Sequence, residues 1–109
     1  MNYDKNNVFA KIIRGEIPSN KVYEDDKVLA FYDLNPKADV HVLLIPKKNC
    51  ISFDDFIKNS SSDEVAYFFK KARDIAELLD VKSYKIVSNI GEKAGQVVFH
   101  YHLHILGYK

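Results

Sequence analysis

Apolar residues recur at helical spacing in two stretches of the chain. Close to the N-terminus, a short amphipathic pattern that stops at Gly15 predicts a helix over roughly 6–14. The stronger pattern follows i, i+3, i+4, i+7 spacing for about four turns. Ser61, with Glu64 three residues later, resembles a capping box at its start. These signals predict a long helix over 62–80.

Shorter runs of β-branched, aromatic and leucine residues between turn residues indicate strands. Five strands are expected, over 22–24, 28–32, 41–45, 84–88 and 99–106. The first two flank the charged run at 25–27 and form a predicted hairpin, and one further helical turn fits 54–57. Two main helices and a five-stranded antiparallel sheet give an α+β fold. The length of 109 residues predicts a single domain over 1–109.

Composition and charge narrow the range of functions. Apolar residues make up 47% of the chain and aromatic residues 13%, which is typical of a globular protein. The net charge of +1 gives no broad electrostatic footprint for nucleic acid or an anionic membrane, although a local cluster of cations could bind a small anion. Cys50 is the single cysteine, which excludes an internal disulfide and a cysteine-rich zinc site. Without a signal-type N-terminus or a membrane-length apolar stretch, we expect a cytoplasmic protein.

All four histidines are candidates for one site. Three occupy alternate positions in the last predicted strand, and the fourth lies in the strand predicted over 41–45. Because side chains alternate between the faces of a strand, the three imidazoles would stand side by side and the apolar residues between them would face the other way. The histidines are His41, His100, His102 and His104, and the intervening apolar residues are Tyr101, Leu103 and Ile105.

Four interpretations of this cluster remain open. The imidazoles could be structural, although each buried ring then needs a hydrogen-bond partner. They could bind a metal, because alternate histidines on a strand, together with His41, suit zinc. They could act at phosphorus, where one imidazole attacks and its neighbours hold phosphate oxygens. The loop 91–96 favours this third interpretation, because its two glycines let backbone N–H groups approach an anion. In the fourth interpretation the protein binds a nucleotide without acting on it.

The histidine run resembles the signature of a known family. Residues 100–106 match the histidine triad motif His-φ-His-φ-His-φ-φ, in which φ is apolar. Upstream, residues 8–18 and 23–33 resemble the opening helix and first hairpin of the Hint branch of the histidine triad (HIT) family. His41 and the run 44–48 follow at the expected places, so the resemblance covers nearly the whole chain.

The resemblance implies a phosphoramidase-type hydrolase that acts at the α-phosphorus of purine nucleoside 5′-phosphoramidates or related conjugates. It implies that His102 is the nucleophile and forms a transient nucleotidyl-histidine. His100 would orient His102 through its main-chain carbonyl, His104 would contact the phosphate, and His41 would complete the polar cluster. No metal or cofactor is required, and a homodimer is expected with helix 62–80 and a sheet edge near its interface.

The same resemblance implies a set of nucleotide-binding positions. Asp33 matches the residue that binds the ribose hydroxyls, and a carboxylate suits this task because it accepts two hydrogen bonds from a diol. The base pocket would be built by Val8, Phe9, Ile12, Phe31 and Leu34. The positions near the phosphates would be Asn89, Gly95, Gln96 and Val97.

Val97 departs from the family pattern. The Hint branch usually has a hydroxyl residue three positions before the triad, where it holds the phosphate and assists the leaving group, and the side chain of valine cannot donate a hydrogen bond. We therefore expect slow chemistry or reliance on backbone donors. Two alternatives stay open: hydrolysis of dinucleoside polyphosphates, as in another branch of the family, and a nucleotide-binding or interaction module with weak catalysis. Neither nucleic acid nor a membrane is expected as a partner.

Overall fold

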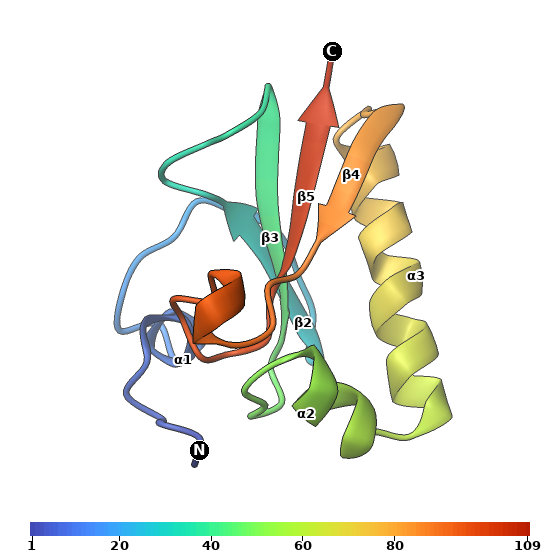
Figure 1. Cartoon of the computed structure of the whole chain (residues 1–109). Helices are drawn as coiled ribbons and strands as arrows, with labels where there is room; N and C mark the ends of the chain where they lie inside the picture. The colour runs from blue at the N-terminus through green and yellow to red at the C-terminus, as the bar shows by residue number, and fades with distance from the viewer.

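Five antiparallel strands form one sheet in the order β1-β2-β3-β5-β4 (Figure 1). The structure is a computed structural model and describes residues 1–109. The strands are β1 Lys21–Glu24, β2 Val28–Tyr32, β3 Val40–Pro46, β4 Ser83–Val87 and β5 Leu103–Tyr108. The helices are α1 Val8–Ile13, α2 Phe53–Lys58, α3 Ser62–Leu78 and the short 3₁₀ turn η1 Glu92–Ala94. The predicted α+β fold with a five-stranded antiparallel sheet is confirmed.

Helices cover both faces of the sheet. In Figure 1, α3 runs along one face and α1 lies on the other. Each face has its own apolar cluster, and alternate residues of β3 enter one cluster or the other, so six of its seven residues are buried. A strand buried on both faces reads as a continuous apolar run, which is the pattern of the stretch 41–45.

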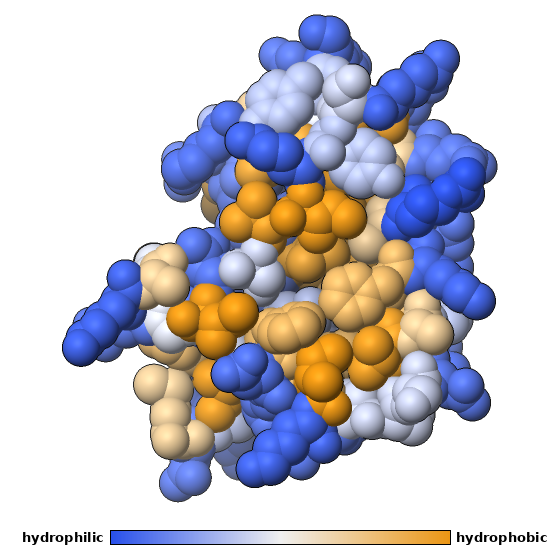
Figure 2. Space-filling view, turned by 45° about the vertical axis from the view of Figure 1, so that its right-hand side comes forward, coloured by the Kyte–Doolittle hydropathy of each residue, from blue (hydrophilic) through white to orange (hydrophobic).

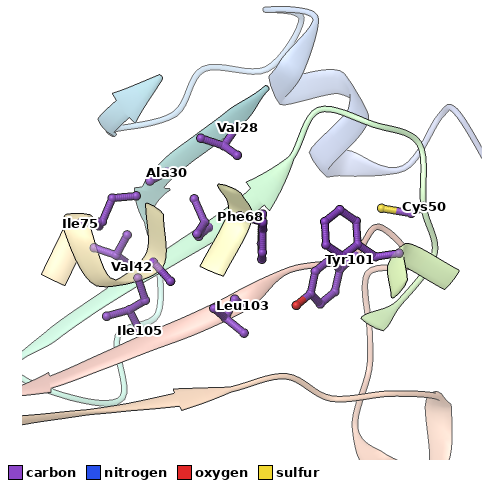
Figure 3. Close-up of a cluster of buried hydrophobic side chains, with 12 residues drawn as sticks. Val28, Ala30, Val42, Cys50, Phe68, Ile75, Tyr101, Leu103 and Ile105 are labelled. Atoms are coloured by element: carbon purple, nitrogen blue, oxygen red, sulfur yellow. The ribbon is translucent and has the colours of Figure 1, made fainter. Parts of the chain in front are cut away.

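The larger cluster lies between the sheet and α3 (Figure 3). Leu103 and Ile105 of β5 point into it, and Tyr101 stacks on Phe56 and contacts Phe68 at ring-centroid distances of 5.1 and 5.2 Å. The prediction that the apolar residues between the histidines face away from them is therefore confirmed. This packing fixes which face of β5 the histidines occupy.

The capping box predicted for the long helix is present. The Ser61 side chain accepts a hydrogen bond from the Glu64 amide, and the Glu64 carboxylate accepts one from the Ser61 amide. The helix ends at Leu78, two residues before the predicted end, and Asp80 follows in a left-handed conformation with φ of 56°. Most of the other elements differ from their predicted bounds by one or two residues, which is usual for helix and strand ends.

The last strand begins later than predicted and extends further. We expected it over 99–106, but residues 99–102 lie outside the ladder, because β3 and β4 pair with β5 only from Leu103 onward. The strand continues through Gly107, where a Cβ atom would lie 2.5 Å from the Val81 side chain. Glycine is used there because Val81 packs directly on the backbone, a contact that alternation along the chain does not reveal.

Candidate active site

A cleft of about 580 Å³ lies on the α1 side of the sheet, across the ends of β3 and β5. Eight of the residues predicted for the site line it: Phe9, Asp33, His41, Asn89, Gly95, Val97, His102 and His104. The register between β3 and β5 brings His41 and His104 close together. Leu43 is paired with His104, and His41 is paired with Leu106, so the two imidazoles are diagonal neighbours on one face.

His102 has a fixed tautomer. Its Nδ1 lies 2.7 Å from the main-chain carbonyl oxygen of His100, and a carbonyl only accepts, so Nδ1 carries the proton and donates. The second nitrogen, Nε2, therefore has a free lone pair. The ring is 8% exposed and packs edge-on against Phe9, with the centroids 5.0 Å apart. An imidazole held in this way can act as a nucleophile.

His41 and His104 form a short hydrogen-bonded relay. The Lys37 amide donates to Nδ1 of His41 over 3.1 Å, so the proton of neutral His41 lies on Nε2. This Nε2 lies 2.9 Å from Nδ1 of His104 and donates to it. His104 is then protonated at Nε2 and presents a donor next to His102, whose ring centroid is 5.1 Å away. The cleft thus places a lone pair and an N–H donor side by side.

His100 does not join the other imidazoles in the cleft, and the expectation of three rings in a row is wrong. Its ring is fully buried, with Nε2 2.7 Å from the Pro46 carbonyl oxygen and Nδ1 2.6 Å from the hydroxyl of Tyr3. The reason is that residues 99–102 leave the ladder, so alternation alone no longer sets the direction of this side chain. His100 acts on the cleft only through its carbonyl oxygen, which accepts from Nδ1 of His102.

Burial lowers the pKa of all four histidines. For His100 burial brings the pKa to about 4, against the opposing hydrogen bond to Pro46. The pKa of His104 also falls to about 4, through burial and then through the neighbouring His102 and His41. Burial is the largest cause for His41 and His102 too, and Asp33 opposes it in both. The imidazoles are therefore neutral near pH 7, as a nucleophile requires.

An apolar pocket of about 330 Å³ adjoins the cleft. It is lined by the five positions predicted for the base: Val8, Phe9, Ile12, Phe31 and Leu34. Phe9 and Asp33 line both hollows, so the carboxylate lies between the apolar pocket and the imidazoles. One Asp33 oxygen accepts from the Asn35 amide over 2.8 Å, and the other lies 3.5 Å from Nε2 of His41.

The glycine loop lines the cleft, but its amides are used internally. Gly91 and Gly95 have φ of 89° and 97°, and the amides of Ala94, Gly95 and Gln96 all donate within the loop. The Gln96 side chain is buried and is not part of the cleft. Its oxygen accepts from Gly91, and its nitrogen donates to the Ile51 and Val98 carbonyls. The structure thus places Gln96 under the loop, where it holds the loop in shape.

The backbone that follows the loop carries free donors. The amides of Val97 and Val98 donate to no acceptor in the protein, and both residues line the cleft. The Val97 side chain is 83% exposed at the rim. Free backbone donors at this edge are consistent with the expectation that the chain relies on backbone donors where Val97 replaces a hydroxyl residue.

Sequence reasoning missed several contributors. Lys37 fixes the His41 tautomer with its amide and lines the cleft, and Tyr3 bonds to His100. Leu43, Val98 and Leu106 form apolar walls. A loop lysine and a tyrosine close to the N-terminus carry no pattern that marks them. Only the alternation of β3 indicated Leu43, which shares a face with His41.

One group of side chains has a geometry that a metal ion could use. Ligand atoms of Asp33, His41 and His104 lie within 4.8 Å of one another. The nitrogens that join His41 to His104 already form a hydrogen bond, so an ion would have to replace that bond. None of the helices combines the length and apolar character needed to cross a bilayer.

The fold and site define a class of protein: a small α+β protein whose sheet presents two neutral imidazoles, each held by a further histidine, and a carboxylate beside an apolar pocket. The model of the HIT domain matches residues 14–109, and the chain belongs to the HIT family.

The relatives cover nearly the whole chain. A HIT-like protein of Rickettsia prowazekii is 49% identical, and the match covers 98% of this chain and 91% of that protein. The structure of a histidine triad protein from Clostridium difficile is 42% identical with a TM-score of 0.87, covering 100% of this chain and 95% of that one. A HIT family hydrolase from Clostridium thermocellum is 41% identical with a TM-score of 0.83, covering 95% and 91%. This likeness supports a hydrolase-type enzyme.

Proposed function

We propose that this protein hydrolyses purine nucleoside 5′-phosphoramidates or closely related nucleotide conjugates at the α-phosphorus. The observation that carries the proposal is the pairing of a free lone pair on Nε2 of His102 with the N–H donor at Nε2 of His104. A nucleophile beside a donor suits attack on a phosphorus whose oxygen is held by that donor.

The two hollows suit the parts of a nucleotide. The base enters the apolar pocket, where Phe9 and Phe31 supply aromatic surface. Asp33, at the boundary of the hollows, accepts hydrogen bonds from the ribose hydroxyls. The phosphate then lies between the histidines and the free amides of Val97 and Val98.

The reaction proceeds in two displacements. Nε2 of His102 forms a bond to the α-phosphorus as the phosphorus–nitrogen bond of the substrate breaks, and the amine leaves with a proton taken from water. Water then attacks the same phosphorus, the bond to His102 breaks, and the nucleoside monophosphate is released with the imidazole regenerated. The His104 N–H stabilises the charge on the phosphate oxygen in both steps, and no metal or cofactor is required.

Val97 supports two alternative functions. Because its side chain gives the leaving group no proton, a conjugate whose leaving group is already stable as an anion would react without help. A dinucleoside polyphosphate has such a leaving group. The same lack of a donor is consistent with a nucleotide-binding module of weak activity. Comparing turnover of an adenosine phosphoramidate with that of a diadenosine polyphosphate distinguishes these functions.

We also propose that the protein is a homodimer through β4 and α3. The strand β4 lies at the edge of the sheet with four of its five residues exposed. Figure 2 shows hydrophobic side chains gathered in the middle of the face that comes forward from the α3 side of Figure 1. Leu78 at the end of α3 and Ile86 on β4 are exposed apolar residues of these two elements. An unpaired strand beside an apolar face suits a symmetric contact with a second copy.

Replacement of His102 tests the proposed activity. The His102→Ala variant should lose turnover by at least about a thousandfold, because the nucleophile is gone, while its affinity for a nucleoside monophosphate stays within about threefold. Val87→Ala removes two methyl groups from a residue that lines the cleft but carries no reacting group, so it should keep turnover far above that of His102→Ala. Retention of full hydrolysis by His102→Ala would show that another group attacks.

A further inference from the structure

The hydroxyl of Tyr3 lies 2.6 Å from Nδ1 of His100, and the two rings pack edge to face with their centroids 5.6 Å apart. Nε2 of His100 lies 2.7 Å from the Pro46 carbonyl oxygen and must donate to it. Nδ1 of the neutral ring is then an acceptor, so the phenol of Tyr3 is the donor. The hydroxyl of Tyr3 therefore fixes which nitrogen of a fully buried imidazole carries the proton.

This bond is next to the atom that sets the tautomer of His102. The carbonyl of His100 accepts from Nδ1 of His102. Residues 99–102 are outside the strand ladder, so the sheet does not fix this carbonyl. The His100 carbonyl and the Tyr101 amide form one planar peptide unit, and that amide donates to the Cys50 carbonyl over 2.8 Å. Further along, the Ser88 hydroxyl donates to the His102 carbonyl. The bond to Cys50 holds the amide end of this peptide unit, and the His100 residue at its carbonyl end is held by the two hydrogen bonds of its ring.

The segment that carries Tyr3 is itself held in place. The backbone and side-chain nitrogens of Asn7 both donate to the Asp4 carbonyl, over 3.1 and 2.7 Å. The Arg14 side chain donates to the Lys5 carbonyl over 2.7 Å. Asn7 also caps α1, the helix that places Phe9 against His102. One continuous segment thus contacts both the positioning histidine and the nucleophile.

We propose that Tyr3 is a positioning residue of the active site: its hydroxyl holds His100, whose carbonyl keeps His102 in the tautomer with a free Nε2 lone pair. Without the hydroxyl, Nδ1 of His100 is buried without a partner, and the ring relieves this by shifting or by changing tautomer. The carbonyl then moves with the ring, and part of the His102 population takes the Nε2–H tautomer. That tautomer has no lone pair directed at the phosphorus and does not react.

The predicted effect of Tyr3 on the reaction rate rests on the proposed function, whereas its effect on the histidine tautomers can be measured without any activity. The Tyr3→Phe variant removes one oxygen and keeps the ring that packs on His100. Tyr67→Phe is the matched control, because its hydroxyl bonds to Asp25 on the α3 side of the sheet, away from the histidines. Loss of that bond should lower the free energy of unfolding and leave the tautomers of the four histidines unchanged.

Long-range ¹H–¹⁵N correlation spectra of the histidine rings give the direct readout. In the wild type, His100 should be protonated at Nε2 and His102 at Nδ1, each as a single tautomer. In Tyr3→Phe, His102 should show a mixture of tautomers, and formation of the nucleotidyl adduct in a single turnover should slow about tenfold, as expected for loss of one hydrogen bond. Nucleoside monophosphate affinity should change by less than about twofold. Tyr67→Phe should match the wild type in all three measurements.

Two results would overturn the inference: a wild-type His100 protonated at Nδ1, or a Tyr3→Phe variant with unchanged His102 tautomer and adduct rate. The first needs no variant, so the test stands even if Tyr3→Phe folds poorly. A wild-type protein that forms no adduct with any nucleotide conjugate would contradict the proposed function instead, and the tautomer spectra would still decide the role of Tyr3.

Discussion

At the scale of residues, the four imidazoles have different roles because their partners differ. A carbonyl fixes His102, an amide fixes His41, His41 fixes His104, and a carbonyl with a phenol fixes His100. Each partner determines the nitrogen that keeps a lone pair. The lone pair of His102 and the N–H of His104 are the two imidazole groups that the cleft offers to a substrate.

Acid should destabilise the protein through its buried histidines. The folded pKa of His100 and of His104 is about 4, below the ordinary 6.5, so the unfolded chain binds more protons between these values. The free energy of unfolding is then highest above pH 6.5 and falls as the pH decreases toward 4, by about 3 kcal/mol for the fully buried His100. Urea denaturation at half-unit pH intervals measures this fall. A midpoint that stays constant from pH 7 to pH 5 would contradict the lowered pKa of the buried His100 and His104.

The sequence predicted the four histidines as one site, and the resemblance supplied the contact between His102 and the His100 carbonyl; that contact is present. It did not predict that the His100 ring turns away from the cleft or that Tyr3 meets it. Alternation predicts faces only within a strand, and 99–102 lie outside the strand. Contacts between the N-terminal segment and residue 100 depend on the packing of α1, which no local pattern encodes.

At the scale of elements, one carboxylate joins the first hairpin to α3. Asp25 accepts hydrogen bonds from the Lys27 and Val28 amides, each over 2.8 Å, and from the hydroxyls of Tyr23 and Tyr67. Burial raises the pKa of this carboxyl, but the four hydrogen bonds outweigh burial and lower it to about 2. The turn at 25–27 was predicted from its charges, and the link to a helix about forty residues away required the folded structure.

Replacing Asp25 by Asn should lower the free energy of unfolding by about 1–2 kcal/mol at pH 7, because the amide nitrogen cannot accept from the tyrosines. The loss should disappear in acid. The carboxylate contributes fully above its unfolded pKa of 3.8, and this contribution decreases as the pH falls toward about 2. Asp26→Asn, at the exposed neighbouring position, is the control and should behave as the wild type. Equal stability of the two variants at pH 7 would contradict the link.

The bounds of β5 also differ from the prediction because they depend on contacts between segments distant in the sequence. The strand was predicted to end at Leu106, yet it continues because Gly107 pairs with Val40 and Tyr84, and the absence of a side chain at Gly107 leaves room for Val81. Long strongly patterned elements such as α3 were predicted within two residues. The bounds of β5 depend on its two neighbours in the sheet, and the sequence of one segment does not predict how it pairs with distant strands.

At the scale of the whole molecule, the histidine cleft and the proposed dimer surface lie on different parts of the sheet. The cleft opens on the α1 side, and the apolar face lies along β4 and α3 (Figure 2). Val87 lines the cleft and belongs to β4, so the two surfaces are joined by one short strand. Association of two chains would therefore steady one wall of the site.

Placing a charge on the edge strand tests the dimer. Sedimentation equilibrium should give twice the chain mass of 12.6 kDa for the wild type and a shift toward the single chain for Ile86→Lys, because a buried unpaired charge opposes the contact. Leu34→Lys, exposed beside the apolar pocket on the α1 side, is the matched control and should remain dimeric. A wild type that sediments as a single chain at all concentrations would contradict the proposed association.

The central claim is that His102 attacks phosphorus. It is tested most directly by quenching a single turnover of an adenosine phosphoramidate with acid-free denaturant and locating the adduct by peptide mass spectrometry. The account predicts a mass increase of one nucleoside monophosphate on His102, attached through Nε2, and none in His102→Ala. An adduct on another residue, or product formation with no adduct at any time, would contradict it.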